Sequence, residues 1–547
     1  MHIQPSPEML QELPSPPYPL SVKHANLESL FNISYWLWRL NPLSVLPVML
    51  SSAVDVLKQS VIVIALLFGL SQLSASGALS ALAEAIRARN LSALFSTLSS
   101  IAPTIIFVIV MSASMFLIVS VIAGGFLNSA EYGSYLRLLH QGALSFGDVF
   151  KEMRVRWAKM AWTVLMVETL KFGPLLVALA SIFYDILRLS FARPDSLQYP
   201  LLFADRLILW SGLILLSLVF TSVLAFLTIY AYPAAADGSY GFAAVRRSTK
   251  VCTKLIVNTI VYCALRASSL VLVGLVSLAT GLLGVQISSI ATIIVGFLVT
   301  PVFHIFKTAV FLKAKPEPVV IPLPVGPPVF KDVFSHVLRT GFEKVKEGLH
   351  ELAVFVVEPR SASFHLSSAI VFSVGAILGK QMSSSGIRQV IYALGYVPGR
   401  ANPLSEVMYG LPFLALDISF HNWQVSLATT LSGIIFVAPV LVTLVFNGFV
   451  LGVVEDVVQN LTLFLAAILP HGVVELPAFI IAGSAGLSLG FEFLKALKRG
   501  ISNSETELGR AFVRAVHIAL GLVPLFIVAG IIETFVTPQI MYLYGWR

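Results

Sequence analysis

Long uninterrupted runs of apolar residues dominate this chain. The run that begins at Ile101, IAPTIIFVIVMSASMFLIVSVIAGG, contains no charged residue. A helix needs about 20 such residues to cross the hydrocarbon core of a bilayer. Strands of a membrane barrel would alternate apolar and polar side chains with a period of two, and this run does not. The pattern therefore predicts an all-α fold, a polytopic transmembrane helical bundle.

The apolar runs divide the chain into two halves. Counting runs of about 18 residues or more predicts roughly eleven spans, about six before Lys313 and about five after residue 360. Between them, KAKPEPVVIPLPVGPPVF carries prolines that cannot continue a helix. In the segment that follows, apolar residues recur every three or four positions, which predicts an amphipathic helix on the membrane surface. The expected parts are an N-terminal segment (1–42), an N-terminal bundle (43–313), a linker with a surface helix (314–360) and a C-terminal domain (361–547).

Composition supports a membrane rather than a soluble protein. Hydrophobic residues make up 57% of the chain and charged residues only 12%, and the mean hydropathy is +0.87. An average soluble domain carries about 25% charged residues. Because so little charge cannot cover a soluble surface, the lipid bilayer is the expected solvent.

The net charge of +8 belongs to loops beside the spans rather than to a nucleic-acid surface. Basic residues gather in 137–159, 246–254, the linker helix and 495–514, all on one side if the span count holds. The positive-inside rule then places the N-terminus and the linker in the cytoplasm of a cell-membrane protein. The basic, amphipathic segments 135–159 and 241–254 are expected to lie along anionic headgroups. Membrane lipids are thus expected partners, and nucleic acid is not.

The sequence contains no motif typical of an enzyme. Cys252 and Cys263 have no metal-ligand spacing. The sequence contains no Walker motif, no Gly-x-Ser-x-Gly elbow and no dinucleotide fingerprint in a suitable structural context. The sequence therefore predicts no catalytic residue, no cofactor and no metal, and the protein is not expected to be an enzyme.

The most informative stretch is ILPHGVVELPAFIIAGSAGLSLGFEF, which contains His471 and Glu475. Residues four apart share one face of a helix, so these two side chains can touch. Pro470 suits the first turn of a helix, which would place the pair near the outer membrane boundary. Gly472 lies between them in the sequence.

Three interpretations of this ionisable pair stay open. It is a buried hydrogen bond that fixes packing, a proton or substrate relay, or a metal or hydrolytic site. Two ligands are too few for most zinc sites, and the nearest candidates for further ligands are Glu533, His421 and His517. Glu533 interrupts an apolar span and is expected to approach the same outer face. We therefore predict a functional polar cluster made of His471, Gly472, Glu475 and Glu533.

Small residues mark two further features. Asn447 and Gly448 are interpreted as a break between two spans, and the alternative is a tight helical turn. Gly483, Gly486 and Gly490 recur at three- and four-residue spacing, which predicts a strip where another helix can approach closely.

One ion pair is expected in the N-terminal half. Glu168 and Lys171 lie three apart in an apolar span, so they can pair on one helix face. We interpret this pair as structural.

The C-terminal half, about residues 364–537, resembles the stage II sporulation protein M family of integral membrane proteins. The resemblance rests on NGFVLG, PHGVVELPAFIIAGSAGLSLG and IIETFVTP, which occur in that order. It covers about a third of the chain and implies a prokaryotic membrane protein that acts in membrane remodelling.

The N-terminal half departs from that pattern. Its segment from about residue 123 to 313, with GGFLNSAEYGSYLRL and YPAAADGSYGFAAVRRS, weakly resembles the membrane region beside some glycerophosphodiester phosphodiesterases. The phosphodiesterase domain itself is absent, so no enzyme activity is carried over.

Three functions are therefore weighed. The first is a non-enzymatic role in membrane organisation or remodelling, with lipids and with protein partners or a second copy of the chain. The second is a transporter or channel in which His471, Glu475 and Glu533 line a polar path. The third is an intramembrane hydrolase, which would require bound metal.

Overall fold

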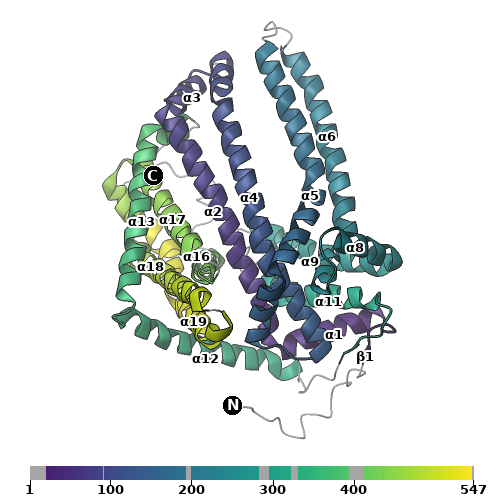
Figure 1. Ribbon diagram of the computed structural model, residues 1–547. Coiled ribbons are helices and arrows are strands. Elements are labelled where there is room, and N and C mark those ends of the chain that lie inside the picture. The colour runs from purple at the N-terminus through teal and green to yellow at the C-terminus, as the bar shows by residue number, and fades with distance from the viewer. Residues whose placement is uncertain are drawn as a thin grey trace.

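The fold is a bundle of long helices in which the N-terminal and C-terminal halves lie side by side (Figure 1). The computed structural model describes residues 20–89, 91–192, 199–282, 295–321, 330–393, 412–434, 437–499 and 501–544. This confirms the predicted all-α polytopic bundle.

The helices of the N-terminal half are α1 (Leu27–Leu40), α2 (Leu46–Ala75), α3 (Ala78–Arg87), α4 (Leu91–Gln141), α5 (Phe146–Ala192), α6 (Tyr199–Leu227), α7 (Ala231–Ala236), α8 (Phe242–Lys254), α9 (Ile256–Leu282) and α11 (Thr300–Lys313). Those that follow are α12 (Phe330–Val357), α13 (Ala362–Met382), α14 (Arg388–Ala393), α16 (Pro412–Ser432), α17 (Val437–Val458), α18 (Leu461–Arg499), α19 (Ile501–Gly521), α20 (Val523–Phe535) and α21 (Thr537–Leu543). Short turns of 3₁₀ or π helix occur at Pro42–Val45, Val295–Val299 and Ser383–Ile387.

Eight helices among the described residues are long and apolar enough to cross a bilayer, or up to nine if a bent pair counts as one span. The bent pair is Val61–Ala75 with Ala78–Arg87, which meet at 78°. Gly77 lies at the bend with φ +71°, a left-handed conformation that glycine adopts at little cost. The predicted span centred near Val295 lies partly outside the described residues, because 283–294 are not among them.

Large apolar side chains cover the outer faces of these spans. On α6, Ile208 and Leu215 are 75% and 66% exposed. An exposed apolar surface of this kind is unfavourable in water and suits lipid tails. The protein is therefore a multi-pass membrane protein.

The basic segments gather at one end of the bundle. In Figure 1, α12 lies across the lower end of the bundle with α19 just above it, and α8 lies in the lower half on the side away from α12. Arg514 of α19 donates to Glu351 of α12 at 2.5 Å and to Glu358, the residue just after α12, at 2.7 Å, which ties the surface helix to the C-terminal half. The assignment of this end to the cytoplasm stays a prediction.

The two halves share one buried core. It extends from Val22 and Leu30 in the N-terminal half to Trp423 and Phe526 in the C-terminal half, and α2 packs against α16 and α17. The linker is also tied to the N-terminal half, because β2 (Val320–Ile321) pairs antiparallel with β1 (Leu20–Ser21).

A cluster of buried polar residues lies inside the N-terminal half. We call Glu131 and Tyr132 of α4, with His304 and Lys307 of α11, the Glu131 cluster. His304 contacts the Glu131 carboxylate, and Lys307 Nζ donates to the Tyr132 hydroxyl at 2.5 Å. Glu131 is 7% exposed and Lys307 is 8% exposed. Each charge is therefore buried next to a polar partner.

A second set of contacts continues from this cluster to the predicted ion pair. Tyr132 stacks on Tyr232 with ring centroids 5.9 Å apart, and the Tyr232 hydroxyl donates to Glu168 at 2.7 Å. Lys171 lies 3.4 Å from the same carboxylate. The predicted pairing of Glu168 and Lys171 is therefore confirmed, and the pair belongs to a larger structural network.

The structure contradicts the predicted break at Asn447 and Gly448. Both residues lie inside the continuous helix α17, and Asn447 donates to the Thr443 carbonyl one turn earlier at 2.8 Å. A Cβ atom on Gly448 would lie 2.0 Å from the carbonyl oxygen of Phe372 on α13. Glycine is present here because the backbones of two helices touch, not because the chain turns.

The same close approach recurs along the α13–α17 pair. A Cβ atom on Gly379 of α13 would lie 2.0 Å from the Phe449 carbonyl oxygen, and one on Gly452 would lie 1.9 Å from the Ala376 carbonyl oxygen. These helices pack with almost no side chain between them.

Candidate functional site

His471 and Glu475 lie further from the start of helix α18 than the sequence predicted. Asn460 caps its first turn by accepting the N–H of Leu463 at 3.1 Å, and Pro470 lies inside the helix rather than in that turn. His471 follows Leu461 by ten residues, or about 15 Å along the helix axis. The prediction that Pro470 begins the helix was therefore wrong. Membrane helices tolerate an internal proline because neighbouring helices satisfy the freed backbone group.

The structure brings His471, Glu475 and Glu533 together. Each residue offers one ligand atom, and these atoms all lie within 4.8 Å of one another. We call these three residues the His471 cluster. The first two come from one face of α18, as their spacing predicted, and Glu533 comes from α20.

The third member lies close to the junction of α20 and α21. Val536 separates the two helices, and Pro538 lies in the first turn of α21. Thr537 at the start of α21 is buried, and its hydroxyl lies 3.2 Å from Nδ1 of His471. Glu533 and Thr537 are four residues apart, so one face of this segment presents a carboxylate and a hydroxyl to the same imidazole.

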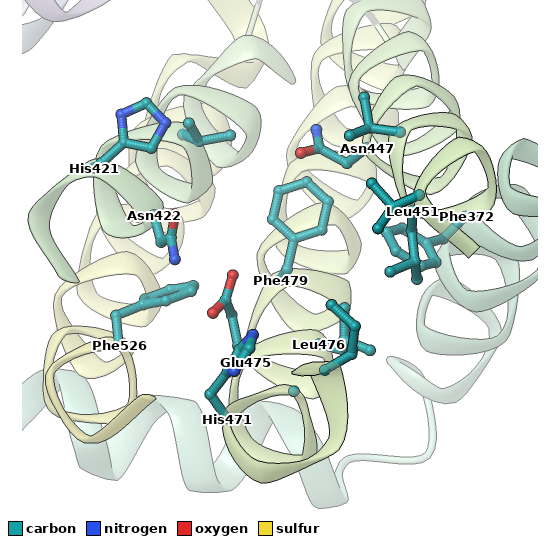
Figure 2. Close-up of a pocket in the computed structure, with 15 residues that line it drawn as sticks. Phe372, His421, Asn422, Asn447, Leu451, His471, Glu475, Leu476, Phe479 and Phe526 are labelled. Atoms are coloured by element: carbon teal, nitrogen blue, oxygen red, sulfur yellow. The ribbon is translucent and has the colours of Figure 1, made fainter. Parts of the chain in front are cut away.

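The cluster borders a cavity of about 260 Å³. Helices α13, α16, α17, α18 and α20 all contribute to its wall, which includes His471, Gly472 and Glu475. Figure 2 shows Phe479 and Leu476 forming the apolar part of this wall. Since a water molecule occupies about 30 Å³, the cavity has room for several waters or a small solute.

The Glu475 carboxylate points into this cavity with part of its hydrogen-bonding capacity unused. Figure 2 shows it facing the amide of Asn422. Its Oε2 atom is buried and has no hydrogen-bond partner among the described residues. A buried polar atom without a partner is costly, so this oxygen is a place where a ligand, a proton or water can bind.

The predicted glycine strip packs against two neighbouring helices. Cβ atoms on Gly483 and Gly490 would lie 2.7 and 2.8 Å from the side chains of Leu444 and Val437 on α17. A Cβ atom on Gly486 would lie 2.8 Å from the Thr429 carbonyl of α16. The strip therefore lets α18 approach the helices that close the cavity.

The two histidines considered as further ligands, His421 and His517, lie in different places. His421 lines the cavity with Asn422 and Asn447, whereas His517 lies 3.5 Å from Glu347 of α12, away from the cavity. Sequence reasoning missed Asn422 and Thr537. The polar stretch SFHNWQ within an apolar helix was a signal for Asn422.

These features define the C-terminal part of the chain as a helical membrane domain with a polar cavity. Residues 368–538 match the model of the family described as Stage II sporulation protein M, which confirms the resemblance of the C-terminal third to that family. The His471 cluster lies within this matched segment. The weak resemblance of the N-terminal half stays a prediction.

One relative is similar to part of the chain. An uncharacterized protein of Methanocaldococcus jannaschii is 25% identical over 166 residues, which is 28% of this chain and 92% of that protein. No solved structure matches the chain.

Proposed function

We propose that the C-terminal domain is a membrane transport unit that binds a cation at the His471 cluster and moves a small solute, or the cation itself, through the adjoining cavity. The proposal rests on the unpaired Oε2 atom of Glu475, which borders the cavity. Ionisable side chains inside membrane segments are costly and mark ion or substrate pathways.

The composition of the cluster favours a cation as the first ligand. Two ionised carboxylates at this separation repel each other, and a proton or a metal ion relieves that repulsion. An imidazole beside them can accept or release a proton near neutral pH. His421 and Asn447 continue the polar lining beyond Glu475, so a bound ion or solute would have polar partners along the cavity.

Three ligand atoms are also the number that many catalytic zinc sites use together with a bound water. An intramembrane hydrolase would therefore need stoichiometric metal at this cluster. We retain the non-enzymatic proposal and make metal content one measurement of the test.

Flux in liposomes tests the proposal. The full chain is reconstituted with an enclosed pH-sensitive dye, and the decay of an imposed proton gradient is followed. We expect wild-type protein to dissipate the gradient and Glu475→Gln to slow the decay about tenfold or more, because hydrogen bonds to a charged group contribute about 1.5–3 kcal/mol. Glu492→Gln is the matched control, since Glu492 lies on the same helix but pairs with Lys495 outside the cavity.

Metal analysis separates the two kinds of cation. If purified wild-type protein holds a stoichiometric divalent metal that Glu475→Gln loses, the flux assay is repeated with that metal as the transported ion. The proposal fails if neither protons nor divalent ions cross faster than in empty liposomes.

Membrane organisation is a second proposed role, and α12 supports it. This amphipathic helix lies across the basic end of the bundle and exposes Phe342 and Val357 at 77% and 78%. Apolar side chains on such a helix insert at the boundary between headgroups and acyl chains. Deformation of vesicles by wild-type protein, lost in Phe342→Ser, would support this role.

A further inference from the structure

A second cavity, of about 160 Å³, lies in the N-terminal half and is lined by basic residues. Three of them, Arg247, Lys250 and Lys254, come from α8 at spacings that share one helix face. Lys315, just after α11, also lines the cavity. Four cationic side chains thus surround a space large enough for a small anionic group.

The arrangement of these cations is partly fixed by contacts within the protein. Asp237 accepts from Arg247 at 2.7 Å and from Lys315 at 2.5 Å. The Arg247 guanidinium also lies over the ring of Phe311, 5.0 Å from its centroid. Lys254 Nζ donates to the Ala314 carbonyl at 3.4 Å. The cavity is therefore built before any ligand enters it.

The charges in this cavity are only partly balanced. Asp237 contacts two of the four cations, and exposed Lys250 has no carboxylate partner among the described residues. Arginine and lysine together suit an anion with several oxygens, because the guanidinium fork and the ammonium groups can each donate to a different oxygen.

The cavity also lies beside the start of a candidate membrane span. The membrane span of α9 begins at Ile256, two residues after Lys254. Ile256 and Val257 are 49% and 66% exposed, which suits contact with acyl chains. A phosphate group at the end of such chains would therefore reach the basic cavity.

We propose that this cavity is a binding site for a phosphate group, carried by an anionic lipid headgroup or by a soluble phosphate compound. The site is separate from the His471 cluster and does not depend on the transport proposal. It would anchor the N-terminal half at the basic end of the bundle.

Binding measurements on the full chain test this site and its source of phosphate. In one arm, native mass spectrometry follows the titration of detergent-solubilised protein with phosphatidylglycerol and with phosphatidylcholine. In the other arm, calorimetry follows the titration with inorganic phosphate. Lys250→Gln is compared with Arg246→Gln, because exposed Arg246 lies on the same helix but does not line the cavity.

We expect Lys250→Gln to weaken phosphatidylglycerol binding about fivefold, the effect of removing one basic residue near an anionic surface. Arg246→Gln should bind as the wild type does. The same pattern with inorganic phosphate, and no preference for phosphatidylglycerol, would assign the site to a soluble compound.

Two results would overturn the proposal. One is that wild-type and Lys250→Gln protein, which must elute alike on size exclusion, bind phosphatidylglycerol equally and also bind inorganic phosphate equally. The other is an equal loss in Arg246→Gln, which would show general surface attraction instead of a site.

Discussion

The Glu131 cluster and the His471 cluster both bury charged groups among apolar helices, but they differ in how those groups are paired. In the Glu131 cluster, His304 contacts the carboxylate and Lys307 donates to Tyr132. In the His471 cluster, an oxygen of Glu475 has no hydrogen-bond partner among the described residues, and a cavity lies beside it.

This difference separates two uses of buried charge. Removing one partner of a buried pair leaves an uncompensated charge and destabilises the fold, so both partners are needed for stability. An incompletely paired carboxylate contributes little to stability and is open to a ligand. We therefore expect substitutions in the Glu131 cluster to affect folding and those in the His471 cluster to affect transport.

The largest effect is expected from Glu131→Ala. It leaves His304 and Lys307 buried without their carboxylate, which should cost about 3–5 kcal/mol of stability. Thermal unfolding in detergent measures the loss, and Glu84→Ala, an exposed position on α3, is the control. Equal unfolding temperatures for the two variants would contradict the structural role of the Glu131 cluster.

A smaller loss is expected from Gly379→Ala, which tests the packing of the helices beside the cavity. The added Cβ would lie 2.0 Å from the backbone oxygen of Phe449, and overpacking of this kind costs about 1–3 kcal/mol. Gly274→Ala is the matched control, because nothing lies within 4 Å of a Cβ atom there. If both variants unfold at the same temperature, α13 and α17 pack less closely than described.

The smallest effect on stability is expected from Glu475→Gln. The amide keeps the shape of the side chain and removes a charge that lacks a full set of partners, so stability should change by less than about 1 kcal/mol. Thermal unfolding of this variant is compared directly with that of Glu131→Gln. A loss in Glu475→Gln as large as in Glu131→Gln would mean that both clusters are structural.

Patterns within one helix could be predicted from the sequence. The apolar runs predicted the helical bundle, and the spacing of His471 and Glu475 predicted their shared face. The position of Glu533 in an otherwise apolar span suggested its approach to them. Each of these inferences depends on helix geometry or on the cost of charge in lipid.

Contacts between distant helices could not be predicted in the same way. Glu131 and His304 are 173 residues apart, and no periodic pattern connects them. The presence of ionisable residues in apolar segments was the available signal. Asn447 and Gly448 misled for a related reason, because a glycine that permits close packing cannot be distinguished locally from one that permits a turn.

The close packing of α13 against α17 has a mechanical consequence. Helices whose backbones touch at Gly379, Gly448 and Gly452 have no space to slide or tilt independently, so this pair forms a rigid wall of the cavity. Alternating access would then require motion on the opposite wall. There, the segment that carries Glu533 and Thr537 contacts α18 at the His471 cluster, and its movement would carry Glu533 away from His471.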